Sequence, residues 1–199
     1  KNIILIEDCA HSFGSILNKK FSGTFGNAGV YSYYSTKAVF AGEGGVVVTD
    51  DNDISELMKD FIVYDRFKQK MNIGCNIRLS ELQALMIYAV IKEYTEIIKN
   101  KFQTAKKYSD ICKNFNIQYI SQKNNFMSGN YYKFTIISPN ENISRLLPKV
   151  KTTTSKVYDY ALGKSKEIPL KHLCLPIWFD LEESISDKVL SELKTANEV

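Results

Sequence analysis

Residues 3–8 read Ile-Ile-Leu-Ile-Glu-Asp, four aliphatic side chains in a row followed by two acids. A short run that is apolar throughout is typical of a strand that is buried on both faces in a parallel sheet. Open α/β sheets place their ligands at the carboxyl ends of their strands, and Asp8 falls at such an end. We therefore expect an α/β fold, with Asp8 at the ligand-binding edge of a mainly parallel sheet.

Strand and helix patterns alternate along the rest of the chain. Asn52 or Asp53 is the expected cap of the first helix. Ser80 and Gln83 form a capping box for the second helix, which meets no Gly or Pro before its end. The predicted strands are 30–34, 46–49, 117–120 and 131–137, and the predicted helices are 54–62, 81–114, 142–147 and 180–193.

Charge is distributed unevenly over the 199 residues. Residues 1–98 carry 10 basic and 12 acidic side chains, whereas residues 99–199 carry 16 and 10. Such a step in surface character indicates two structural units. We predict that residues 1–98 are the end of an α/β domain and that residues 99–199 form a small α+β domain.

Composition and residue spacing exclude several classes of protein. The net charge of +4 is far below the basic excess of proteins that bind nucleic acid through its phosphates. The four cysteines are too widely spaced for a zinc site, so we expect no metal, and the absence of any need for disulfides indicates a cytoplasmic protein. No segment approaches the length of an apolar membrane-spanning helix, so we expect no membrane partner.

Four residues with reactive or ionisable side chains surround the first two predicted strands: Asp8, His11, Ser32 and Lys37. Taken singly, the aspartate is a cap or turn former, the histidine a hydrogen-bonded structural residue and the lysine a solvated amine. Together, an anion for a ring nitrogen, a hydroxyl for a phosphate and a desolvated amine for an aldehyde are what pyridoxal phosphate requires.

Five sequence blocks carry a resemblance to a known family, each weak alone but highly specific in this order and spacing. They are IEDCAHSFG (6–14), GTFG (23–26), VYSYYSTK (30–37), GEGGVVVT (42–49) and GCNIRLSELQA (74–84). With them, about residues 2–90 closely resemble the DegT/DnrJ/EryC1/StrS sugar aminotransferases. Beyond the blocks, only residues 173–176 and the helix after Asp180 are similar to this family.

The resemblance implies a pyridoxal-phosphate-dependent aminotransferase of fold type I. Its substrate would be a nucleotide-linked keto sugar, and its usual amino donor would be glutamate. By resemblance, Lys37 forms the Schiff base with the cofactor and shuttles protons, and Asp8 pairs with the ring nitrogen. His11 would lie against the ring, and Ser32 would bind the phosphate.

Two further residues receive roles from the resemblance. Asn76 would reach the phosphate from the neighbouring subunit of a homodimer, which then shares its active site. Arg78 is a candidate for binding a carboxylate or phosphate of the donor or substrate, and its structural interpretation is a surface arginine. Some relatives have histidine in place of the lysine and act as dehydratases, and Lys37 argues against that branch.

The matched blocks correspond to the second part of longer family members, so we expect this chain to be the C-terminal part of a longer protein. Two alternatives stay open. The chain could be a truncated, non-catalytic remnant that acts as a binding or scaffold module. It could also be an enzyme, such as an aldolase, that forms a Schiff base through a lysine without pyridoxal phosphate.

Overall fold

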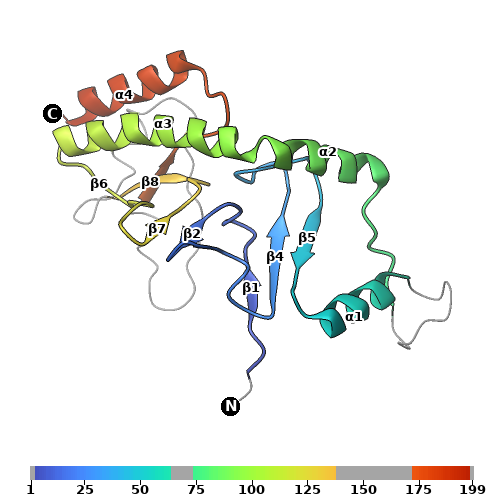
Figure 1. The fold of residues 1–199 in the computed structure, drawn as a ribbon. Helices are drawn as coiled ribbons and strands as arrows, with labels where there is room; N and C mark the ends of the chain where they lie inside the picture. Colours follow the sequence, from blue (N-terminus) through green and yellow to red (C-terminus); the bar gives the residue numbers. More distant parts are fainter. Residues whose placement is uncertain (1–2, 64–73, 138–171, 198–199) are drawn as a thin grey trace. The chain divides into compact units, whose positions relative to one another are not determined.

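The aliphatic run near the start of the chain leads into strand β1 (Ile6–Asp8) of a three-stranded sheet. β1 pairs in parallel with β4 (Ala28–Ser32), and β4 pairs antiparallel with β5 (Gly45–Val48). The three strands lie side by side in the order β1-β4-β5 (Figure 1). Among the described strands this sheet is therefore mixed, and not mainly parallel as expected.

The structure is a computed structural model that describes residues 3–63, 74–137 and 172–197. The predicted helix over residues 142–147 lies outside this part of the chain. Contacts divide the chain into two compact units, residues 1–95 with 125–129 and residues 96–124 with 130–199.

The predicted burial of the aliphatic run on both faces is wrong. Ile3, Ile4, Leu5 and Ile6 each expose between 51% and 77% of their surface. The reason is that β4 is the one described strand that pairs with β1, and the residues before Ile6 lie outside that ladder. An apolar run indicates that side chains avoid water, but it does not indicate what covers them.

A hairpin interrupts the path from β1 to β4, in a stretch where no strand was predicted. β2 (Ile16–Leu17) and β3 (Lys20–Phe21) pair antiparallel, and β7 (Met127–Ser128) pairs with the other edge of β2. The turn residues Asn18 and Lys19 both have positive φ, at 49° and 64°. Two such residues form the two-residue turn that matches strand twist, and the lysine obscured its usual sequence signal.

Helix α1 (Asn52–Val63) begins after a cap that was predicted one or two residues too late. The Asp51 side chain accepts the N–H groups of Asp53 at 2.9 Å and Ile54 at 3.2 Å. Asp51 is therefore the capping residue, in place of Asn52 or Asp53. The adjacent acids made the three positions equivalent in sequence.

The second predicted helix is two helices. α2 (Glu81–Lys92) starts at the predicted capping box, in which Ser80 and Gln83 exchange side-chain and backbone hydrogen bonds. At Glu93 the backbone leaves helical geometry, with φ −93° and ψ 2°, and α3 (Tyr94–Asn114) follows. Neither Gly nor Pro marks this break. The chain changes from the first unit to the second near the start of α3.

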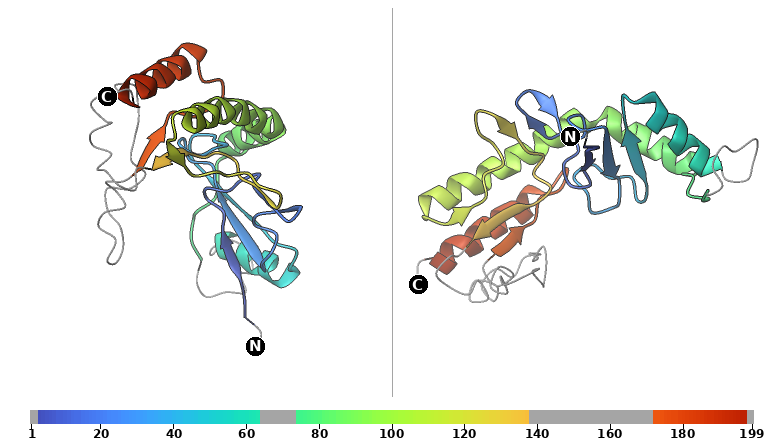
Figure 2. Two further views of the ribbon diagram at one scale, coloured as in Figure 1. Left: turned by 90° about the vertical axis from the view of Figure 1, so that its left-hand side faces the viewer. Right: turned by 90° about the horizontal axis from the view of Figure 1, so that it is seen from below.

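In the second unit, α3 and α4 (Glu183–Asn197) lie on the same side of an antiparallel sheet (Figures 1 and 2). Its strands, in the order β6-β8-β9, are β6 (Gln118–Tyr119), β8 (Phe134–Ile137) and β9 (His172–Leu175). The side chains that fill the space between helices and sheet are Ala105, Tyr108, Cys112, Phe134, Ile136, Leu173, Leu175, Val189 and Leu193.

Candidate functional site

Two of the predicted site residues end neighbouring parallel strands. Asp8 is the last residue of β1 and Ser32 the last residue of β4. The register pairs Asp8 with Val30, so Ser32 extends the same edge by two residues. Because residues two apart on a strand point to one face, Asp8 and Ser32 lie on the same face of the carboxyl edge.

Local hydrogen bonds fix the orientation of both side chains. Oδ1 of Asp8 accepts the N–H of Ala10 at 3.0 Å, and Oγ of Ser32 accepts the N–H of Tyr34 at 3.3 Å. Aspartate and serine commonly make such bonds to the backbone two residues on. They leave the second carboxylate oxygen of Asp8 and the hydroxyl proton of Ser32 for a ligand.

An aromatic cluster holds the segment after β1, which carries His11. The Phe13 ring packs edge-on against Tyr31 and Tyr33, with centroid distances of 5.4 and 5.5 Å, and against Tyr94 at 5.9 Å. Each such pair contributes about 0.5–1.5 kcal/mol beyond its buried area. His11 is exposed two residues before this anchor, so the cluster fixes its backbone beside β4.

Lys37 lies in a loop whose two ends are both bound to Tyr33. The N–H of Tyr33 donates to the Gly44 carbonyl, and the N–H of Ala41 donates to the Tyr33 carbonyl, both at 2.9 Å. Tyr33 is itself almost fully buried, and burial raises the pKa of its phenol to about 12. Both ends of the Lys37 loop are therefore hydrogen-bonded to Tyr33, a buried residue whose side chain is neutral.

Within this loop, a tight turn and two buried neighbours fix the position of Lys37. Its N–H donates to the Tyr34 carbonyl at 2.9 Å, which closes the turn. Ala38 and Val39, the next two residues, are buried, whereas Lys37 is half-buried. The amine therefore extends from a backbone that tertiary packing holds in place.

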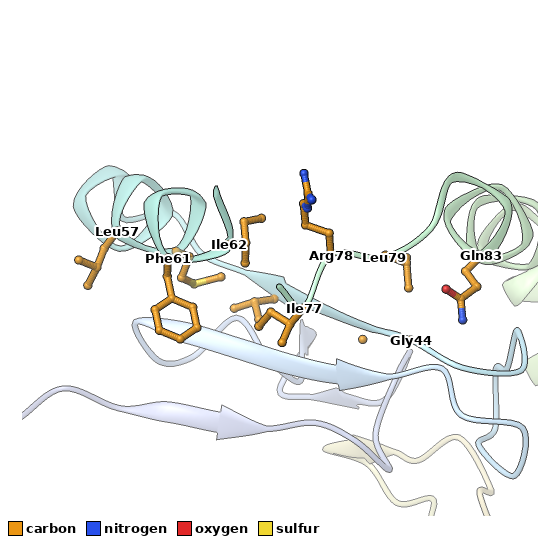
Figure 3. Close-up of a pocket in the computed structure, with 11 residues that line it drawn as sticks. Gly44, Leu57, Phe61, Ile62, Ile77, Arg78, Leu79 and Gln83 are labelled. Carbon is orange, nitrogen blue, oxygen red and sulfur yellow. The ribbon is translucent and has the colours of Figure 1, made fainter. Parts of the chain in front are cut away.

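Asn76 and Arg78 lie in a different segment, just before α2. Nε of Arg78 donates to Oδ1 of Asn76 at 3.4 Å, and both residues are exposed. Arg78 lines a largely apolar pocket of about 670 Å³ between β5, α1 and residues 77–83. Figure 3 shows the Arg78 guanidinium pointing away from the strand, while Phe61 and Ile77 point toward it.

Glu7 has a structural role that the sequence analysis missed. Oε1 accepts the N–H groups of Phe25 at 2.6 Å and Gly26 at 2.7 Å, and Oε2 accepts that of Gly23 at 2.7 Å. Burial raises the pKa of Glu7, but these hydrogen bonds outweigh burial and hold the pKa below its ordinary value. No local signal identified this role, because the Gly-Thr-Phe-Gly turn lies 16 to 19 residues after Glu7 in the sequence.

The structure thus places Asp8, His11, Ser32 and Lys37 at or just after one sheet edge. A carboxylate, a hydroxyl and an amine at such an edge can pair with a cationic nitrogen, donate to a phosphate and add to a carbonyl carbon. Among the described residues, no group of three His, Cys, Asp or Glu side chains could hold a metal ion. The same residues include no helix long and apolar enough to cross a bilayer.

Comparison with known proteins shows similarity in both sequence and fold. The model of the DegT/DnrJ/EryC1/StrS aminotransferase family matches residues 1–194. The chain is 32% identical over 113 residues to GDP-perosamine synthase from Escherichia coli O157:H7, which covers 54% of this chain and 31% of that protein. It is 30% identical over 118 residues to UDP-4-amino-4,6-dideoxy-N-acetyl-beta-L-altrosamine transaminase from Helicobacter pylori, over 56% of this chain and 32% of that protein.

A solved DegT DnrJ EryC1 StrS aminotransferase from Brucella abortus has the same fold. Its TM-score is 0.86 at 20% identity, over 98% of this chain and 58% of that chain. The expected fold-type-I class is therefore confirmed for the matched part. The matched segments span about a third of the length of these two curated relatives.

Proposed function

Because the chain belongs to the DegT/DnrJ/EryC1/StrS aminotransferase family, we propose that it provides the lysine-bearing part of a sugar aminotransferase. The proposed reaction transfers an amino group from glutamate to a keto sugar linked to a nucleotide. The observation that carries this proposal is the placement of Asp8, Ser32 and Lys37 at one sheet edge. The names of the two curated relatives contain GDP and UDP, which supports a nucleotide-linked substrate.

The residues at this edge fit pyridoxal phosphate, the cofactor of the family. Asp8 retains a carboxylate oxygen beyond its bond to Ala10, and Ser32 retains its hydroxyl proton. These groups complement a protonated ring nitrogen and a phosphate, and the Lys37 amine complements an aldehyde. When bound, the cofactor would supply an electron sink for negative charge that forms beside the transferred nitrogen.

Each residue then has a definite task. Asp8 holds the proton on the ring nitrogen by charge pairing, and Ser32 orients the phosphate. Nζ of Lys37 anchors the cofactor and later accepts a proton from the donor carbon and returns one to the sugar carbon. The fixed turn of Lys37 restricts this transfer to side-chain rotations, which favours a constant geometry from one half-reaction to the other.

We propose a homodimer in which Asn76 reaches the phosphate site of the partner subunit. Its exposure supports this role, because a residue that acts across an interface is exposed in a single subunit. We propose that Arg78 binds the carboxylate of the amino donor. Its guanidinium, which points away from the strand in Figure 3, presents planar donors that suit a bidentate partner.

Borohydride reduction tests the assignment of Lys37. Purified protein is incubated with pyridoxal phosphate, reduced and digested, and the modified peptide is identified by mass spectrometry. We expect the modification at Lys37, its loss in Lys37→Ala, and its retention in the control Lys59→Ala, since Lys59 is an exposed residue of α1. Modification of another lysine, or of none, would contradict the proposal.

This labelling, together with a transamination assay and a labelling with a carbonyl substrate alone, separates the alternatives. A binding or scaffold remnant would show no specific modification and no transamination of nucleotide-linked keto sugars. A Schiff-base enzyme that works without the cofactor would instead be modified at Lys37 by a carbonyl substrate alone.

A further inference from the structure

A lysine-lined groove runs along α3 in the second unit, apart from the residues of the proposed active site. Lys99, Lys106 and Lys113 recur at seven-residue spacing, which places them on one face of the helix. A fourth lysine of the groove, Lys123, comes from the segment after β6. The groove has a volume of about 440 Å³, and none of the described residues that line it is acidic.

The positive charge of this groove is only weakly neutralised by the protein. Lys99 forms one ion pair, with Glu96 at 3.2 Å, and both side chains are more than half exposed. Such exposed pairs contribute little, so an anionic ligand can replace Glu96 at small cost. Among the described residues, Lys106 and Lys113 form no ion pair.

Aromatic rings form the floor of the groove but offer little free surface for stacking. Tyr119 and Tyr131 each stack on Phe134, with centroid distances of 5.5 and 6.2 Å. The Lys123 ammonium lies 5.4 Å from the centroid of Phe102, over its ring. Binding of single-stranded nucleic acid relies on free aromatic faces, so the floor does not favour that class of ligand.

The spacing of the lysines determines the shape of a matching anion. Seven helical residues rise about 10 Å, so Lys99 and Lys113 are about 21 Å apart along the axis of α3. A single phosphate cannot contact all three helix lysines, whereas a linear array of phosphates can. Lysine presents a point charge with no fixed orientation, which suits flexible phosphate chains better than planar carboxylates.

We propose that this groove binds a chain of linked phosphate groups. The spacing selects inorganic polyphosphate, because the two or three phosphates of a nucleotide span far less than the roughly 21 Å between Lys99 and Lys113. The site lies wholly within the second unit and uses no residue of the proposed active site. It therefore stands whether or not the aminotransferase proposal holds.

Titration calorimetry on the complete chain tests this site with four probes: tripolyphosphate, long-chain polyphosphate, uridine diphosphate and an oligothymidylate. We expect saturable binding of a linked phosphate that weakens as salt is added. Lys106→Ala/Lys113→Ala should lower the affinity by about tenfold or more. The control Lys188→Ala/Lys194→Ala removes two exposed lysines of α4 and should change it by less than about twofold.

The probes also test the length of the phosphate chain. Tighter binding of long-chain polyphosphate than of uridine diphosphate supports the proposal, and tighter binding of uridine diphosphate would overturn it. The proposal would be overturned if both double variants lost the same affinity, or if no probe bound saturably. It would also be overturned if oligothymidylate bound as tightly as polyphosphate and Lys106→Ala/Lys113→Ala weakened both equally. Lys37→Ala should bind as the unchanged protein does, which distinguishes this site from that of the proposed cofactor.

Discussion

At the scale of single residues, Gly23 shows how little space the turn before β4 leaves. Its φ is +86°, and an added Cβ would lie 2.3 Å from the Tyr31 hydroxyl oxygen. We expect Gly23→Ala to lower the free energy of unfolding by about 2–4 kcal/mol, from backbone strain and steric overlap together. Urea denaturation measures this loss.

Gly42 is the matched control for this substitution. Its φ is +88°, but nothing lies within 4 Å of an added Cβ. Gly42→Ala should therefore cost only the backbone strain, about 1–2 kcal/mol. Equal losses in the two variants would show that the overlap with Tyr31 is relieved without cost.

Glu7 makes the stability of the first unit depend on pH. Its pKa is lowered from 4.5 in the folded protein, so the ionised carboxylate stabilises the fold above that value. This contribution is lost as the pH falls below 4.5 and through the lowered pKa. Glu7→Gln should remove it and lower the free energy of unfolding near pH 7 by about 1–3 kcal/mol.

Urea denaturation at pH 7 and pH 3.5 checks this expectation for Glu7. The difference between the unchanged protein and Glu7→Gln should be largest at pH 7 and shrink at pH 3.5. A difference that does not change with pH would mean that the charge of Glu7 is unimportant to the turn.

The candidate site residues could be selected from the sequence because their types and order are specific, and their roles stay predictions. The sequence placed Asp8 just after the first predicted strand, and β1 ends at Asp8, whereas Ser32 was predicted inside strand 30–34 and in the structure ends β4. The role of Glu7 could not be read, because its partners are backbone amides of a turn whose path only the tertiary structure defines. The same holds for the closure of the Lys37 loop on Tyr33.

At the scale of secondary structure, α3 is bound to the segment after β9 by two buried polar side chains. The Tyr108 hydroxyl donates to the Pro176 carbonyl at 2.8 Å, and Nζ of Lys101 donates to the Ile177 carbonyl at 2.9 Å. Lys101 exposes only 2% of its surface. Burial, with a smaller contribution from Lys133, lowers the pKa of Lys101 to about 8.

This buried amine should make the second unit more stable at high pH. The folded protein binds the Lys101 proton less tightly than the unfolded chain, whose lysine keeps the ordinary pKa of 10.5. Burial of the charged Lys101 amine therefore lowers the free energy of unfolding fully below about pH 8, and this loss disappears as the pH approaches 10.5. We expect Lys101→Met to abolish this rise in the free energy of unfolding, which denaturation at pH 7.5 and 9.5 measures. If the free energy of unfolding still rose between pH 7.5 and 9.5 in Lys101→Met, the rise would come from another titrating group.

Local signals predicted most elements of the structure but not their ends. The capping box located α2, the periodic apolar residues located α1, and α4 was predicted over residues 180–193 after Pro176. The break at Glu93 has no sequence signal, because ordinary helix-forming residues surround it. β9 was not predicted as a strand, since a short, fully buried run has no periodicity to identify it.

At the scale of the whole molecule, the first unit exposes many large apolar side chains. They come from the start of the chain, the sheet and α2: Ile3, Ile4, Leu5, Ile6, Val30, Val47, Leu82, Leu85, Met86 and Tyr88. Exposed apolar side chains in such number favour association between molecules. We therefore expect this chain to self-associate at micromolar concentration.

Charged substitutions at this apolar surface should reduce self-association. Ile4→Lys/Ile6→Lys places two charges where the side chains are 72% and 63% exposed, so the fold tolerates them. Sedimentation velocity should show a smaller weight-average mass than for the unchanged protein. The control Ile120→Lys, 48% exposed in the second unit, should have little effect. If Ile120→Lys lowered the weight-average mass as much as Ile4→Lys/Ile6→Lys, then the net charge of the chain, and not these exposed side chains, would control association.

The sequence could indicate two units from its charge step and its long helix, but it could not show which elements belong to each. Residues 125–129 return to the first unit because β7 pairs with β2, more than 100 residues earlier. Such long-range pairing leaves no local pattern.

The closure of the Lys37 loop on Tyr33 has a consequence for hydrogen exchange. The amide protons of Tyr33 and Ala41 are held by the same two bonds that anchor the loop, so they exchange only when the loop opens as one body. Their exchange rates therefore report how often Lys37 leaves the position in which the closed loop holds it. A single labelled peptide over residues 31–41 could follow both amides in the protein with and without added pyridoxal phosphate.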